Sequence, residues 1–142
     1  RNPEVEYETE IRYDSLHRRE PIMFKEQLQS IVDRMDDSVI GAILMDQDGI
    51  PLDKIGEDPD PTMDTETLAM EYTVILKSAL KTAEMVDAGR MNEFYIRNDK
   101  FTTLLRMINE TYFVALFLRP GGNMGKGRFL LRGAAADLVE EL

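Results

Sequence analysis

The longest periodic stretch of the chain, residues 65–88, carries apolar side chains every three or four residues, without a proline or an internal glycine. At 100° per residue this spacing predicts one long amphipathic helix. A narrow stripe is formed by Leu68, Tyr72, Ile75, Ala79 and Val86, and it is widened to about half of the circumference by Leu76, Leu80 and Ala83. A face this wide predicts two contact surfaces, the helix's own sheet and a second one.

The ends of this predicted helix carry recognisable capping residues. Asp64 or Thr65 can accept hydrogen bonds from the first turn, and Gly89 stands where a left-handed residue often terminates a helix. Two further helices are expected, at residues 24–35 and 128–142. The second would bury Phe129, Leu131, Ala135, Leu138, Val139 and Leu142.

Five strands are predicted from the remaining apolar runs. Residues 38–46 and 112–118 are apolar on both faces, which indicates central strands. Residues 50–55 follow the hairpin dipeptide Asp48-Gly49 and contain Pro51, which predicts an edge strand. Residues 91–97 have a mixed pattern and are assigned to the other edge, and residues 101–108 complete a meander.

Residues 1–22 differ from the rest of the chain. Val5, Tyr7, Thr9, Ile11 and Tyr13 alternate with charged side chains, a period of two that is typical of a strand. Two interpretations stay open, a strand added to a sheet edge and a disordered charged leader. The domain organisation is therefore an N-terminal extension, residues 1–22, followed by one domain at residues 23–142.

Composition and charge narrow the function classes. The 142 residues include no cysteine, so disulfides and thiolate metal sites are excluded, and a reducing cytoplasm is expected. The longest apolar runs have seven residues, far short of the roughly 20 that span a bilayer, so no membrane insertion is expected. A net charge of −10 opposes nucleic-acid binding.

Candidate catalytic and ligand-binding motifs are incomplete. The glycine-rich run at residues 121–127 resembles a phosphate loop, but Pro120 occupies its first glycine position and Gly127 replaces the Mg²⁺-binding hydroxyl. It is interpreted as a flexible connection. A calcium loop beginning at Asp46 fails at Ile50 and Pro51, and the single His17 has no catalytic partners. No enzyme activity, cofactor or metal is expected.

The nine methionines have two possible roles. They fill gaps in a core, or, on an exposed helix face, they provide an adaptable partner surface. Met70, Met85 and Met91 are candidates for either role, and the core is favoured.

Two motifs and the order of elements resemble the Roadblock/dynein light chain family. The motifs are residues 42–49 (AILMDQDG) and residues 122–132 (GNMGKGRFLLR), and the second is especially similar to bacterial polarity proteins of the family. The resemblance implies an α+β fold, an α/β/α sandwich with a five-stranded antiparallel sheet in the order 2-1-5-4-3. The second helix would cover one face, and the first and third helices the other.

The resemblance also implies function. Family members form homodimers by pairing third strands and packing second helices. They act as platforms for small Ras-like GTPases and not as enzymes. One interpretation is a dimeric adaptor in a bacterial polarity or motility module, with an MglB-like Roadblock protein, a RomR-like response regulator or a small Ras-like GTPase as partners. The alternative is a direct GTPase-activating co-regulator. The dimer interface is predicted to contain Tyr72, Leu76, Leu80, Ala83, Phe94, Tyr95 and Ile96.

Overall fold

The computed structural model of the chain describes residues 24–58 and 62–142, so the predicted N-terminal strand lies outside the described residues. A helix at residues 24–34 precedes the hairpin of β1 (Val39–Asp46) and β2 (Pro51–Gly56). The long helix α2 (Thr65–Met85) leads to the meander of β3 (Glu93–Arg97), β4 (Thr102–Met107) and β5 (Tyr112–Leu118), and α3 (Met124–Leu138) follows. The predicted order of helices and strands is confirmed.

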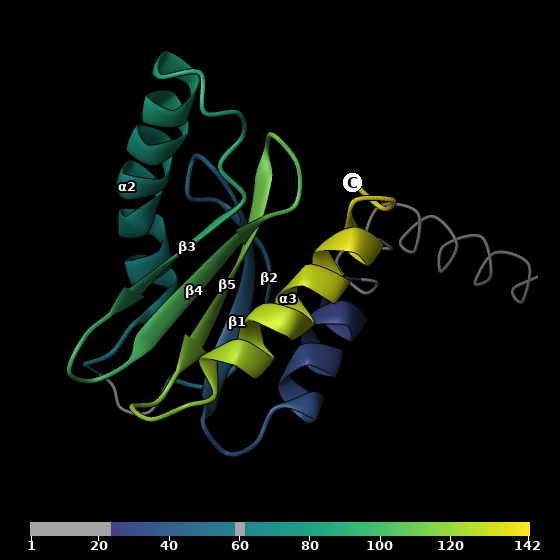
Figure 1. Cartoon of the computed structure of the whole chain (residues 1–142). Coiled ribbons are helices and arrows are strands. Elements are labelled where there is room, and N and C mark those ends of the chain that lie inside the picture. Colours follow the sequence, from purple (N-terminus) through teal and green to yellow (C-terminus); the bar gives the residue numbers. More distant parts are fainter. Residues whose placement is uncertain (1–23, 59–61) are drawn as a thin grey trace, which may run out of the picture.

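One antiparallel sheet organises the fold, with the strand order β2-β1-β5-β4-β3 (Figure 1). Figure 1 shows α2 on one face of the sheet and α3 with the first helix on the other. The predicted α/β/α sandwich is thus confirmed. β1 and β5 are central and almost fully buried, while β2 and β3 form the two edges.

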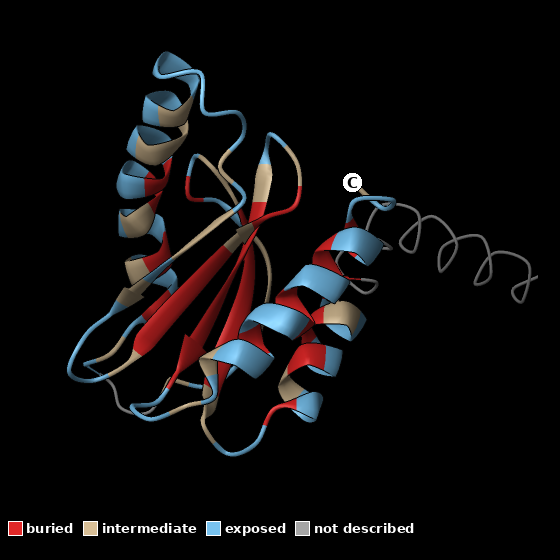
Figure 2. Cartoon of the chain, in the orientation of Figure 1, coloured by how far each residue is buried: buried red, intermediate tan, exposed pale blue. Residues whose placement is uncertain are grey.

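Alternate residues of each central strand point into two separate cores. Leu44 and Leu116 belong to the core under α3 and the first helix, whereas Ile43 and Phe117 belong to the core under α2. Figure 2 shows the buried residues concentrated on the middle strands and on the inner sides of the helices. This two-sided burial explains why β1 and β5 are apolar at successive positions.

The capping of α2 partly follows the prediction. Asp64 is the N-cap, and its side chain accepts a hydrogen bond from the Thr67 backbone N–H at 3.1 Å. Gly89 has the predicted left-handed conformation, at φ 82°, but it is not the residue that ends the helix. Asp87 takes the left-handed conformation at φ 53°, and the Ala88 N–H donates to the Ala83 carbonyl at 2.9 Å. The chain therefore leaves the helix two residues before the glycine.

The glycine-rich run at residues 121–127 was predicted to be a flexible connection, but its second half, from Met124, forms the start of α3. Asn123 is the N-cap of α3, and its side chain accepts from the Lys126 backbone N–H at 3.0 Å. Gly127 is buried in the first turns, where a Cβ atom would lie 2.9 Å from a methyl group of Leu104. The glycine therefore lets α3 approach the sheet closely.

Two residues predicted in the core of α3 are exposed. Phe129 is 65% and Val139 46% exposed, because the buried side of α3 is formed by Leu130, Leu131, Ala134, Ala135 and Leu138. The helix begins at Met124, four residues before the predicted start at residue 128, and ends at Leu138.

Four residues, 47–50, separate β1 from β2 in place of the predicted two-residue turn. The Asp46 N–H donates to the Ile50 carbonyl at 3.0 Å, and Gly49 supplies the left-handed residue at φ 84°. The Asp46 carboxylate also accepts from the N–H groups of Asp48 and Ile50, which stabilises this longer loop.

Candidate functional site

The edge strand β3 is the first part of the candidate site. Among the described residues it pairs only with β4, in a continuous register from Glu93 to Arg97. Phe94 lies opposite Leu105, so its side chain is on the α2 face of the sheet, while Tyr95 lies opposite Leu104 on the α3 face. Tyr95 is 59% exposed. The open edge thus presents apolar side chains on both faces.

A charged cluster fixes the start of this edge strand. Glu93 accepts hydrogen bonds from Arg106 on β4 at 3.1 Å and from the Arg128 Nε on α3 at 2.9 Å. Partial burial alone would raise the pKa of the Glu93 carboxyl, but the hydrogen bonds and charges of Arg128 and Arg106 outweigh it and lower that pKa. The carboxylate therefore stays ionised and ties β3 to two neighbouring elements.

The second part of the site is one flank of α2. The buried side of the helix is formed by Thr65, Ala69, Thr73 and Leu76, and the stripe Leu68-Tyr72-Ile75-Ala79-Val86 lies next to it. The Tyr72 hydroxyl accepts from the Asn98 side chain in the β3–β4 turn at 3.0 Å. This contact shows that the stripe borders the β3 side of the sheet.

The opposite flank of α2 contacts the β1–β2 loop. Lys77 lies 3.4 Å from Asp48, and the Met70 side chain packs on Gly49. Ile75 is 48% and Val86 67% exposed, and both lie on the flank away from that loop. We call the surface made by β3 and the stripe Leu68-Tyr72-Ile75-Ala79-Val86 the edge surface.

Four of the predicted interface residues belong to the edge surface, namely Tyr72, Phe94, Tyr95 and Ile96, whereas Leu76, Leu80 and Ala83 lie outside it. Phe94, Ile96 and Tyr72 lie together on the α2 side of the edge, and Tyr95 is on the other face of β3. Leu76 is only 1% exposed within one subunit, and Leu80 and Ala83 are half-buried beside it. The prediction did not include Ile75 and Val86, which lie on the narrow stripe and are exposed in the single subunit.

The described part of the chain offers little for other chemistry. Residues 24–58 and 62–142 contain no group of three or more His, Cys, Asp or Glu side chains that could hold a metal ion. Within the same ranges, no helix has the length and apolar character needed to cross a membrane.

Comparison with known proteins identifies the fold. No protein-family model and no curated protein matches the chain. Among solved structures, a Roadblock/LC7 domain from Streptomyces avermitilis matches with a TM-score of 0.70 at 13% identity, over 81% of this chain and 93% of that one. MglB in a tetrameric arrangement matches with a TM-score of 0.74 at 18% identity, over 85% and 88%.

A third structure shares more sequence and shows the family. The chain belongs to the Roadblock/LC7 family, because it is 30% identical to one member over 84% of its own length and 98% of that member's. That member is MglC from Myxococcus xanthus, with a TM-score of 0.59. The family resemblance found in the sequence is thereby confirmed.

Proposed function

We propose that this protein is a homodimeric, non-catalytic adaptor in a bacterial module that regulates a small Ras-like GTPase in cell polarity or motility. The similarity to MglC over almost all of that protein's length carries the proposal. The proposed partners are an MglB-like Roadblock protein, a RomR-like response regulator or the GTPase itself, and the proposed compartment is the cytoplasm.

The edge surface supports a dimer as the working form. A two-fold axis through the middle of β3 pairs this strand with its copy and covers an apolar edge that is otherwise an aggregation hazard. The same rotation brings the stripe of α2 toward its copy, which gives Ile75 and Val86 a surface to bury. Leu76 has almost no side-chain area left to bury between subunits. A standard interface covers roughly 1,600 Å² in total, which one strand and one helix flank per subunit can supply.

The dimer is tested by light scattering on the full chain and on two variants of α2. Ile75 and Val74 are adjacent, apolar and 48% and 66% exposed, but they point 100° apart around the helix. Ile75→Asp places a charge in the proposed interface and should weaken dimerisation by at least about tenfold, whereas Val74→Asp should not. Tyr95→Pro, in the middle of β3, should also favour the monomer because proline removes a strand N–H.

Three results would contradict a dimer formed through the edge surface. They are a mass of 16.3 kDa for the unmodified protein at micromolar concentration, a dimer in both Ile75→Asp and Tyr95→Pro, and equal weakening by Ile75→Asp and Val74→Asp. The last result would place the interface on the outer side of α2.

A phosphate-release assay separates the adaptor from a direct GTPase-activating co-regulator. An adaptor should co-elute with an MglB-like protein or a RomR-like response regulator and leave the hydrolysis rate of the GTPase unchanged. Acceleration of hydrolysis by this protein alone would favour the co-regulator. Failure to bind any of the three partners would contradict both functions.

A further inference from the structure

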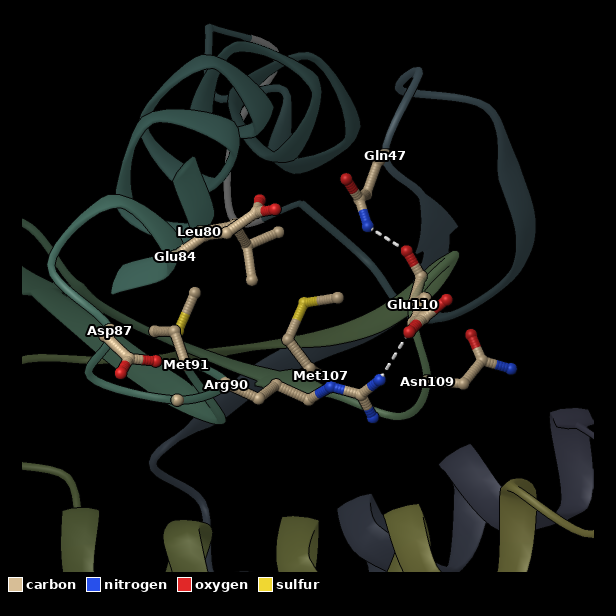
Figure 3. A pocket seen from close by; sticks show the side chains of 10 residues that line it. Gln47, Leu80, Glu84, Asp87, Arg90, Met91, Met107, Asn109 and Glu110 are labelled. Carbon is tan, nitrogen blue, oxygen red and sulfur yellow. Dashed lines mark hydrogen bonds and ion pairs between the residues drawn. The ribbon is translucent and has the colours of Figure 1, made fainter. Parts of the chain in front are cut away.

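A pocket at the C-terminal end of α2 is not used by the proposed dimer surface. It has a volume of about 460 Å³ and lies between the last turns of α2, the segment before β3, the β4–β5 turn and Gln47 of the β1–β2 loop (Figure 3). Leu80, Met91 and Met107 form its apolar floor. Figure 3 shows the two methionine side chains at the centre of the hollow.

The polar wall on one side of this pocket is already bonded. Arg90 forms an ion pair with the Glu110 carboxylate at 2.7 Å, and the Gln47 side-chain amide donates to the Glu110 backbone carbonyl. Figure 3 shows both contacts. Arg90 is the single basic residue of the lining, and its charge is balanced by Glu110.

The wall on the α2 side carries negative charge without a cationic partner. Glu84 and Asp87 line the pocket, and neither takes part in the ion pairs formed among residues 24–58 and 62–142. The last turn of α2 contains no basic residue, so the negative end of the helix dipole adds to the two carboxylates. A cation is therefore favoured at the place where the helix ends.

From this combination we infer that the pocket binds a partner peptide that presents an arginine or lysine side chain beside an apolar residue. The cationic head group lies against Glu84, Asp87 and the end of α2. The aliphatic stem and the neighbouring apolar side chain lie on Leu80, Met91 and Met107. Long basic side chains bind in this way because their stems are apolar and their heads are charged. Methionine side chains adapt to such ligands.

The test uses a defined probe and the full chain. The probe is a peptide of alternating leucine and arginine, and its control contains citrulline, which has nearly the same shape without the charge. Methyl NMR of the methionines reports the place of binding. The arginine peptide should shift the methyl signals of Met91 and Met107 and leave that of Met35, which is buried in the core on the other face of the sheet, in place.

Two matched variants test the charges. Glu84→Gln with Asp87→Asn removes two carboxylates at the pocket, and Asn still tolerates the left-handed conformation of residue 87. Glu71→Gln with Glu140→Gln removes two exposed carboxylates elsewhere and changes the net charge equally. The pocket variant should weaken binding about tenfold, which corresponds to ~1.4 kcal/mol, and the control variant should change it little.

Several outcomes would overturn the inference. They are equal binding of the citrulline peptide, equal weakening by the two double variants, and no methyl shift at about 1 mM peptide. Shifts at Met70 and Met85 in place of Met91 and Met107 would move the binding site to the exposed side of α2. None of these results depends on the proposed dimer or GTPase module, so the two proposals fail separately.

Discussion

Gly127 and Gly133 are in the same helix, α3, but substitution by alanine should change stability in opposite directions. A Cβ atom on Gly127 would lie 2.9 Å from a methyl group of Leu104 and 3.1 Å from one of Leu116. Both leucines are at most 2% exposed, so neither has free space into which it can move. A Cβ atom on Gly133 would meet no atom within 4 Å.

The magnitudes follow from two opposing effects. Replacing glycine by alanine within a helix gains up to about 1 kcal/mol through helix propensity. Overpacking a dense core costs about 1–3 kcal/mol. Gly133→Ala has only the gain and should stabilise the protein by roughly 0.5–1 kcal/mol. Gly127→Ala has both effects, so a net loss of about 1 kcal/mol is expected.

Urea unfolding measures the difference between the two variants. With a slope of about 1–3 kcal/mol per M, a gap of about 2 kcal/mol separates the midpoints by roughly 1 M. All samples need the same subunit concentration, because dimer formation would make the midpoint depend on it. If Gly127→Ala stabilised the protein as much as Gly133→Ala, the close approach of α3 to the sheet would be refuted.

Three further predictions concern single contacts. Asn123→Ala should lower the unfolding free energy by about 1 kcal/mol in urea unfolding because α3 loses its N-cap, and Asn123→Ser should restore most of the loss. The pKa of Glu93 is lowered in the folded protein from its ordinary value of 4.5, so ionised Glu93 stabilises the fold at pH values above 4.5. This stabilisation is lost as the pH falls through the lower pKa of the folded protein. Thermal unfolding of Glu93→Gln should therefore depend less on pH in that acidic range than unfolding of the unmodified protein. Asp87→Gly should raise the melting temperature, because glycine adopts φ 53° without steric cost, and an unchanged or lower value would contradict this reason.

The two edges and two central strands could be predicted from the sequence because strand patterns depend directly on burial. A strand covered on both faces is apolar at successive positions, as in β1 and β5, and Pro51 restricts β2 to an edge. The direction of α2 could not be predicted in the same way. Its apolar arc covers about half of the circumference, so periodicity alone does not show which part of the arc faces the sheet.

Small polar residues decide the direction of α2. Thr65 and Thr73 are buried, and their hydroxyl groups bond to the Asp58 carboxylate and the Met70 carbonyl, each at 2.6 Å. Their hydrogen-bonding needs are thus met within the subunit, and burial costs little. Prediction from the pattern of apolar residues alone places polar residues such as Thr65 and Thr73 on the surface. The larger residues of the narrow stripe, including Ile75 and Val86, consequently lie on the flank and remain available for the edge surface.

The two sheet edges differ in a way that limits how copies of this chain can associate. β2 carries Pro51 and the mostly buried carboxylate of Asp53, whose side chain is 11% exposed, and a register shift interrupts its pairing with β1. Proline, inward charge and bulges are the features that prevent strand addition at an edge. β3 contains no proline, and its pairing with β4 is regular. Its partly buried carboxylate, Glu93, is at the first position of the strand and is paired with Arg106 and Arg128. If both edges were open, β2 of one copy could add to β3 of the next, and such head-to-tail contacts extend without limit. With β2 blocked, edge pairing is restricted to β3 with β3, which closes after two subunits.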